Sequence, residues 1–156
     1  MIQRIQSVYL AISMILLLII SSGMTVFSFA AESMTYVFSV FGWTAVDGEE
    51  NVINHEGYPF YIVSGVLVLL IFWCIMSYKK LDLQLKIGRG ILVLYLLSIT
   101  ALLFMMMTGE DQFTESVTRE LGIGFLLFVL GFPFIFLANV AIKRDKKLLD
   151  SLNRLR

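Results

Sequence analysis

The residues best suited to chemistry in this sequence are His55 and Glu56, which are adjacent in the segment NHEGYP. A carboxylate beside an imidazole can tune the imidazole as a general base, so one hypothesis is an enzyme that works through this pair. No motif places a serine or cysteine nucleophile, and the zinc-binding HExxH spacing does not occur. The single cysteine, Cys74, lies inside an apolar run and is expected to be an inert small hydrophobic residue. We therefore expect no enzyme, no catalytic residue, no metal site and no cofactor.

The elements that would have to position such a site are mostly apolar. Of the 156 residues, 58% are hydrophobic and 15% are charged, and the mean hydropathy is +0.85. Ordinary soluble domains are about 45–50% apolar and about 25% charged. The low charge and the long apolar runs therefore indicate helices in a bilayer rather than the core of a soluble protein.

Four apolar segments reach the length of about 20 residues that a membrane-spanning helix needs. They cover approximately residues 7–29, 58–78, 87–108 and 121–142. We predict an all-α integral membrane protein in which residues 1–142 form a bundle of four transmembrane helices. The first segment has features of a secretory signal peptide, but its apolar character continues past residue 23, so we expect it to be retained.

The charged residues predict an orientation for these helices. If the segments alternate in direction, eleven of the twelve basic residues lie on one side, and only Arg119 lies on the other. The opposite loops carry most of the acidic residues. The positive-inside rule then predicts a multi-pass protein of the bacterial inner membrane, with both termini in the cytoplasm. The basic residues flank the membrane, so nucleic-acid binding has no support.

The longest predicted outer loop, residues 30–57, contains the segment TYVFSVFGWTA. Its β-branched and aromatic residues favour extended structure, and VDGEEN favours a turn, so we expect a small extracytoplasmic β-hairpin-like cap. The aromatic residues of this cap could rest at the membrane interface: Tyr36, Phe38, Phe41 and Trp43.

The last segment, residues 143–156, predicts a basic amphipathic tail, because leucines recur there at helical spacing between basic and polar residues. The fourth helix could continue into the cytosol, or it could bend and lie on anionic lipid. Together with the polar start of the chain, the tail forms a candidate cytoplasmic interface: Gln3, Arg4, Gln6, Lys143, Arg144, Lys146, Lys147, Leu148 and Leu152.

The fourth segment carries the candidate contacts for helix packing or for a partner. Gly124, Gly131 and Ala138 repeat every seventh residue, which makes a smooth stripe where another helix can approach closely. Asn139 is expected to hydrogen-bond across to another helix. Pro133 removes one backbone hydrogen bond and predicts a kink, which serves packing or, alternatively, a gate.

The opening IQRIQSVYL, leading straight into the first apolar segment, resembles the start of a small bacterial membrane-protein family known only as a domain of unknown function. The resemblance implies an origin in Bacteroidota, similar length, a retained first helix, a longer first outer loop and four spans. It implies no activity, substrate or cofactor.

We predict a non-catalytic accessory or scaffolding subunit of an inner-membrane complex. Its expected partners are membrane lipids and an integral-membrane protein or further copies of itself. The alternative is transport or binding of a lipid or another amphipathic molecule through a groove near Pro133. The enzyme hypothesis based on His55 and Glu56 ranks third.

Overall fold

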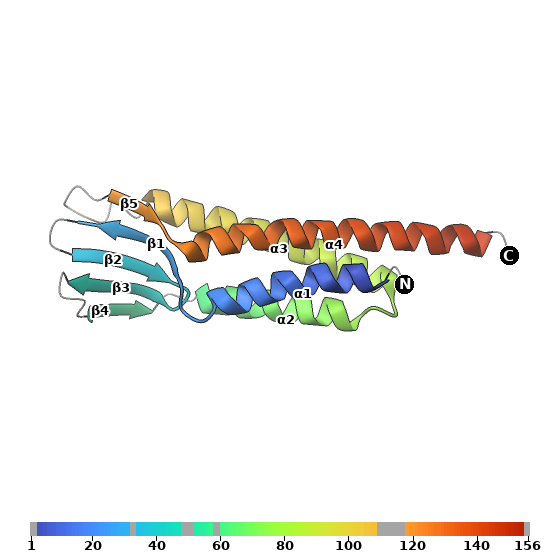
Figure 1. The fold of residues 1–156 in the computed structure, drawn as a ribbon, viewed down its shortest axis with the longest axis horizontal. Coiled ribbons are helices and arrows are strands. Elements are labelled where there is room, and N and C mark those ends of the chain that lie inside the picture. Colours follow the sequence, from blue (N-terminus) through green and yellow to red (C-terminus); the bar gives the residue numbers. More distant parts are fainter. Residues whose placement is uncertain (1–2, 32–33, 48–51, 58–59, 109–117, 155–156) are drawn as a thin grey trace.

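The protein has a layer of helices with an antiparallel sheet attached to one end (Figure 1). The computed structural model describes residues 3–31, 34–47, 52–57, 60–108 and 118–154. The helices in this part are α1 (Gln3–Ile20), α2 (Phe60–Met76), α3 (Leu81–Thr108) and α4 (Ile123–Arg154). The strands are β1 (Thr25–Ala30), β2 (Met34–Ser39), β3 (Gly42–Asp47), β4 (Val52–Gly57) and β5 (Thr118–Leu121).

The sheet has five strands in the order β4-β3-β2-β1-β5, and all neighbouring strands are antiparallel. β5 is far from β1 in sequence but pairs with it, with Ser28 opposite Glu120. Because β5 leads into α4 through Gly122, this pairing attaches the start of α4 to the sheet. The Gly122 amide also donates a 3.0 Å hydrogen bond to the Val26 carbonyl.

The predicted all-α fold with four transmembrane helices is wrong. Only α3 and α4 are long and apolar enough to cross a membrane among the described residues, while the apolar parts of α1 and α2 are shorter, at Ile5–Ile20 and Phe60–Met76. The predicted cap of one hairpin is part of a five-stranded sheet. The prediction is wrong because apolar character alone does not distinguish a helix from a buried strand. Part of the first apolar run forms a strand.

The first predicted segment, residues 7–29, shows this failure directly. α1 ends at Ile20, and the chain turns through Ser21 and Ser22 to Gly23, whose φ of 100° belongs to the left-handed region. Glycine is favoured in that conformation just after a helix, because a Cβ would be strained there. The remaining apolar residues form β1, whose side chains from Val26 to Phe29 are all buried.

The strands predicted within TYVFSVFGWTA are present as β2 and β3, which join at a turn at residues 40–41. The turn predicted at VDGEEN falls mainly on residues 48–51, which lie outside the described residues. Of the aromatic side chains expected at the membrane interface, only Phe41 is exposed, while Phe38 is fully buried. Tyr36 and Trp43 pack against the core from partly buried positions.

A continuous row of aromatic rings joins the sheet to the helices. Phe38 stacks on Phe27 within the sheet, with ring centroids 4.8 Å apart. Phe38 then meets Phe60 of α2 at 6.3 Å, and Phe60 meets Phe128 of α4 at 5.9 Å. Phe128 stacks on Tyr95 of α3 at 4.8 Å. The sheet and the helical layer therefore share one hydrophobic core.

The predicted tail is a continuation of the fourth helix. α4 runs from Ile123 to Arg154 without interruption, and it passes through Pro133. Pro133 therefore lies inside a continuous helix. The segment after residue 142 extends past the start of α1 (Figure 1). Of the two alternatives for the tail, direct continuation of the helix is the one observed.

Candidate functional site

Basic side chains gather at the end of the helical layer that lies opposite the sheet. The start of α1, the connection from α2 to α3 and the last part of α4 lie at this end (Figure 1). We call it the basic end, and its described basic residues are Lys79, Lys80, Lys86, Arg89, Lys143, Arg144, Lys146 and Lys147. The sheet lies at the other end, so these eight basic residues lie together and away from the sheet, as the sequence predicted.

A buried polar pair joins α1 to α4 at the basic end. The Gln6 side-chain amide donates a hydrogen bond to Oδ2 of Asp145, and the two residues are only 1% and 6% exposed. Oδ1 of Asp145 is buried and has no hydrogen-bond partner among the described residues. The sequence allowed Gln6 to bond lipid headgroups, a neighbouring helix end or a partner, and the structure pairs it with the neighbouring helix α4 inside the protein.

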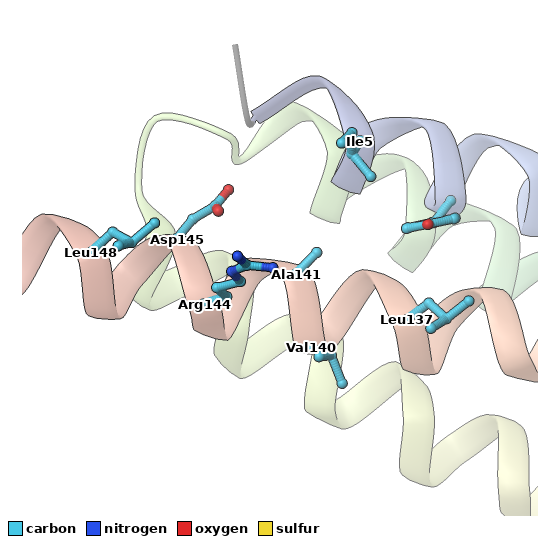
Figure 2. Close-up of a pocket in the computed structure, with 8 residues that line it drawn as sticks. Ile5, Leu137, Val140, Ala141, Arg144, Asp145 and Leu148 are labelled. Carbon is cyan, nitrogen blue, oxygen red and sulfur yellow. The ribbon is translucent and has the colours of Figure 1, made fainter.

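A groove of about 400 Å³ lies beside this pair, between α1 and α4 (Figure 2). Its apolar walls include Ile5 of α1 and Leu137 of α4, while Arg144 and Asp145 lie toward one end. Leu148 also lines it and is 45% exposed. The groove thus combines apolar walls with one exposed cation, Arg144.

A second groove, which we call the α3–α4 groove, has a volume of about 480 Å³. Both helices supply a cation to it, because Arg89 comes from α3 and Lys143 from α4. Its remaining lining residues are mainly apolar: Leu85, Leu92, Val93, Phe136, Asn139 and Val140. Two cations on an apolar groove are suited to an amphiphile with a negatively charged head.

Asn139 fixes the contact between the two helices that form this groove. Its Nδ2 donates a 2.9 Å hydrogen bond to the Gly88 carbonyl of α3 and a 3.1 Å hydrogen bond to the Ile135 carbonyl of α4. Gly88 allows this approach, since a Cβ there would lie 2.4 Å from Asn139 Oδ1. The predicted interhelical role of Asn139 is therefore confirmed.

A third groove, of about 440 Å³, follows the connection from α2 to α3 and includes Lys79 and Lys80. Asp82 of α3 and Lys146 of α4 form an ion pair across it. This pair neutralises one of the cations of the basic end, whereas Arg89 and Lys143 have no ion pair among the described residues.

The glycine and alanine stripe of α4 is used inside the protein. A Cβ on Gly124 would lie 2.6 Å from the Thr25 carbonyl oxygen of β1, and a Cβ on Gly131 would lie 2.2 Å from the Tyr95 hydroxyl. Ala138 is fully buried. The stripe therefore serves packing within the chain, which was one of its two predicted roles.

Replacing Gly124 with alanine is expected to lower the free energy of unfolding by about 1–3 kcal/mol, because a backbone atom of β1 would have to move. Gly90→Ala is the matched control. A Cβ at Gly90 meets nothing within 4 Å, so this change should be neutral or stabilise the helix by up to about 1 kcal/mol. Thermal unfolding of the full-length protein in detergent measures both variants. Equal melting temperatures for the two variants would contradict the close contact between α4 and β1.

Sequence reasoning missed three buried polar residues. The Gln84 amide donates a 3.2 Å hydrogen bond to the Cys74 carbonyl, and the Tyr95 hydroxyl donates a 2.8 Å hydrogen bond to the Phe128 carbonyl. Asp145 is the third. Its position was predictable in part, because the buried positions Ala138 and Ile142 continue to it at helical spacing.

Several predicted site residues lie where the structure describes the backbone alone. His55 and Glu56 lie in β4, where they pair with Thr44 and Trp43 of β3, but their side chains lie outside the described part. The same holds for the side chains of Gln3, Arg4 and Leu152. Within the described residues, no group of three His, Cys, Asp or Glu side chains could hold a metal ion.

The fold and its grooves define a protein with two helices able to cross a membrane, joined end-on to an antiparallel sheet. The chain belongs to the family described as Domain of unknown function (DUF4293), which matches residues 2–155. Membership in a family of unknown function was predicted and is confirmed, while an origin in Bacteroidota stays a prediction. Comparison with curated proteins finds no match. Comparison with solved structures finds none either.

Proposed function

We propose that this protein is a non-catalytic accessory or scaffolding subunit of a complex in the bacterial cytoplasmic membrane. Its two long apolar helices, α3 and α4, would cross the bilayer, and its sheet would stand on the outer surface as a docking platform. The observation that carries this proposal is the shared aromatic core. Because rings from the sheet continue through Phe60 to Phe128 and Tyr95, the sheet is held at a constant position relative to the helices.

The exposed surface of the helices supports their placement in a membrane. Only 22% of the most apolar window of α3 and 33% of that of α4 is buried. A core helix of a soluble protein would be mostly buried. Large apolar side chains such as Leu97, Phe104 and Leu126 are instead more than half exposed, and lipid would cover them. The positive-inside rule then favours the basic end, with both chain termini, on the cytoplasmic side.

The edge strand β5 is the best candidate for partner contact on the platform. Its side chains from Thr118 to Leu121 are all exposed, and Leu121 is a large apolar residue that is 54% exposed. An edge strand can add a strand from another protein through main-chain hydrogen bonds. A partner at this edge would be positioned directly beside the start of α4.

The test is affinity purification of the tagged full-length protein from its native membranes in a mild detergent, with the co-purifying proteins identified and quantified. We expect one membrane protein at a constant ratio. The variant Glu120→Arg, on β5, should reduce recovery of that protein. Asp150→Arg is the matched control, because it reverses an exposed carboxylate at the opposite end of the molecule.

Recovery of the chain alone, or of a homo-oligomer with only lipid, would contradict the accessory-subunit role. It would favour the second candidate function, which is binding or transport of a lipid. The α3–α4 groove supports this candidate, although it lies at Phe136 to Lys143 rather than around Pro133. Equal loss of the partner in Glu120→Arg and Asp150→Arg would argue against docking at β5.

A further inference from the structure

We infer that the α3–α4 groove binds one anionic phospholipid, with the phosphate between Arg89 and Lys143 and an acyl chain along the apolar walls. This inference rests on the proposed membrane placement of the helices, but it does not depend on the accessory-subunit role. It assigns a ligand class to a defined groove at the basic end.

The first argument is the convergence of charge. α3 and α4 run in opposite directions, so residues far apart in sequence meet at the basic end, and Arg89 and Lys143 both line the groove. Neither cation has an ion pair among the described residues, whereas nearby Lys146 is paired with Asp82. Basic pockets between membrane helices on the cytoplasmic side are typical sites for anionic lipid headgroups.

The second argument is the order of polarity along the groove. On α4, Phe136 lies about two turns closer to the sheet than Lys143, and on α3, Val93 lies about one turn closer to the sheet than Arg89. A lipid presents the same order, with a charged head followed by an apolar chain. Val93 is 56% exposed and Phe136 is 52% exposed, so both are accessible to such a chain.

The third argument is that the groove is already formed. Asn139 ties α4 to the Gly88 carbonyl of α3, so the two walls are held at a constant separation. The volume of about 480 Å³ falls within the range of about 300–1,000 Å³ that small-molecule sites occupy. A groove that exists before binding loses less conformational entropy when the ligand enters.

The experiment uses the full-length protein, purified and delipidated in mild detergent. Dioleoyl phosphatidylglycerol and dioleoyl phosphatidylcholine are added in separate titrations, and native mass spectrometry counts the lipids bound to each chain. We expect one phosphatidylglycerol to bind in preference to phosphatidylcholine. Each basic residue near an anionic lipid contributes about fivefold, so Arg89→Gln with Lys143→Gln should weaken phosphatidylglycerol binding about twenty-five-fold.

Two further variants make the result specific to this groove. Lys79→Gln with Lys80→Gln removes the same charge from the neighbouring groove and should change binding by no more than about twofold, since screening limits charges out of contact. Val93→Trp fills the groove without changing any charge and should also weaken phosphatidylglycerol binding. Its melting temperature, together with that of the Arg89 and Lys143 variant, checks that the fold is intact.

Three outcomes would overturn the inference. The first is unchanged phosphatidylglycerol binding in the Arg89→Gln and Lys143→Gln variant. The second is an equal loss in the Lys79→Gln and Lys80→Gln variant, which would show attraction to the basic end as a whole. The third is a stable dimer that covers the groove and leaves it without lipid. This result would assign the groove to a second copy of the chain.

Discussion

Replacing Phe128 with alanine is expected to lower the free energy of unfolding by about 3–5 kcal/mol, the largest effect of any single substitution considered. Phe128 is 1% exposed and packs against both Phe60 and Tyr95. Its removal leaves a cavity where the aromatic row passes from the sheet side to the middle of the helices. Thermal unfolding of the full-length protein in detergent measures the loss.

The Phe128→Ala variant should also become sensitive to protease at the sheet, because the sheet loses part of its attachment to the helical layer. Phe104→Ala is the matched control, since Phe104 is 67% exposed and its removal leaves no cavity. Surface changes of this kind usually alter stability by less than about 0.5 kcal/mol. If both variants melt at the same temperature, the aromatic row does not join the two parts of the protein.

Replacing Gln6 with alanine is expected to lower the free energy of unfolding by about 1.5–3 kcal/mol. Asp145 is buried, and the Gln6 amide is its hydrogen-bond donor. Loss of this donor leaves a buried carboxylate poorly satisfied, because Oδ1 already has no partner among the described residues. Thermal unfolding in detergent again measures the effect.

A double variant separates this interaction from simple loss of packing. Gln6→Leu with Asp145→Leu removes both polar groups, and replacement of both partners by apolar residues is often nearly neutral. The double variant should therefore be more stable than Gln6→Ala. The two single variants, Gln6→Leu and Asp145→Leu, are measured as well. If the double variant loses as much stability as the two single variants together, the two residues are not coupled.

Because Gln6 and Asp145 join α1 to α4 at the basic end, they also position the basic residues beside Asp145 on α4. Arg144 immediately precedes Asp145 on α4, and Lys143 lies two residues before Asp145. The lipid site inferred in the α3–α4 groove therefore depends on a rigid α4, which Asn139 ties to α3 and Asp145 ties to α1. The scaffolding and lipid-binding proposals share this rigid framework, but their experiments test them separately.

Much of the helical layer could be predicted from the sequence. The apolar runs predicted α2 at 58–78 and α3 at 87–108, and the observed helices are Phe60–Met76 and Leu81–Thr108. Hydropathy works for such elements because each forms its own backbone hydrogen bonds within one segment. The same measure misassigned the end of residues 7–29, since burial in a sheet and burial in lipid both favour apolar residues.

The candidate site was less predictable than the helices. The cations Lys143 and Arg144 were expected at a cytoplasmic interface, and they lie at the basic end. That Lys143 shares the α3–α4 groove with Arg89 was not predictable, because Arg89 comes from a different helix. The burial of Gln6 was not predictable either, because its partner Asp145 is 139 residues away in sequence.

The sequence by itself determined the apolar character of the helices, the extended structure within residues 35–45 and the concentration of basic residues at one end. These properties depend on composition and on local backbone preference. The tertiary structure decided that β5 pairs with β1, that Gly124 and Gly131 pack inside the chain, and that Arg89 and Lys143 share a groove. Such contacts depend on which segments pack together. The burial of the residues in each contact is therefore set by the whole chain and not by any one segment.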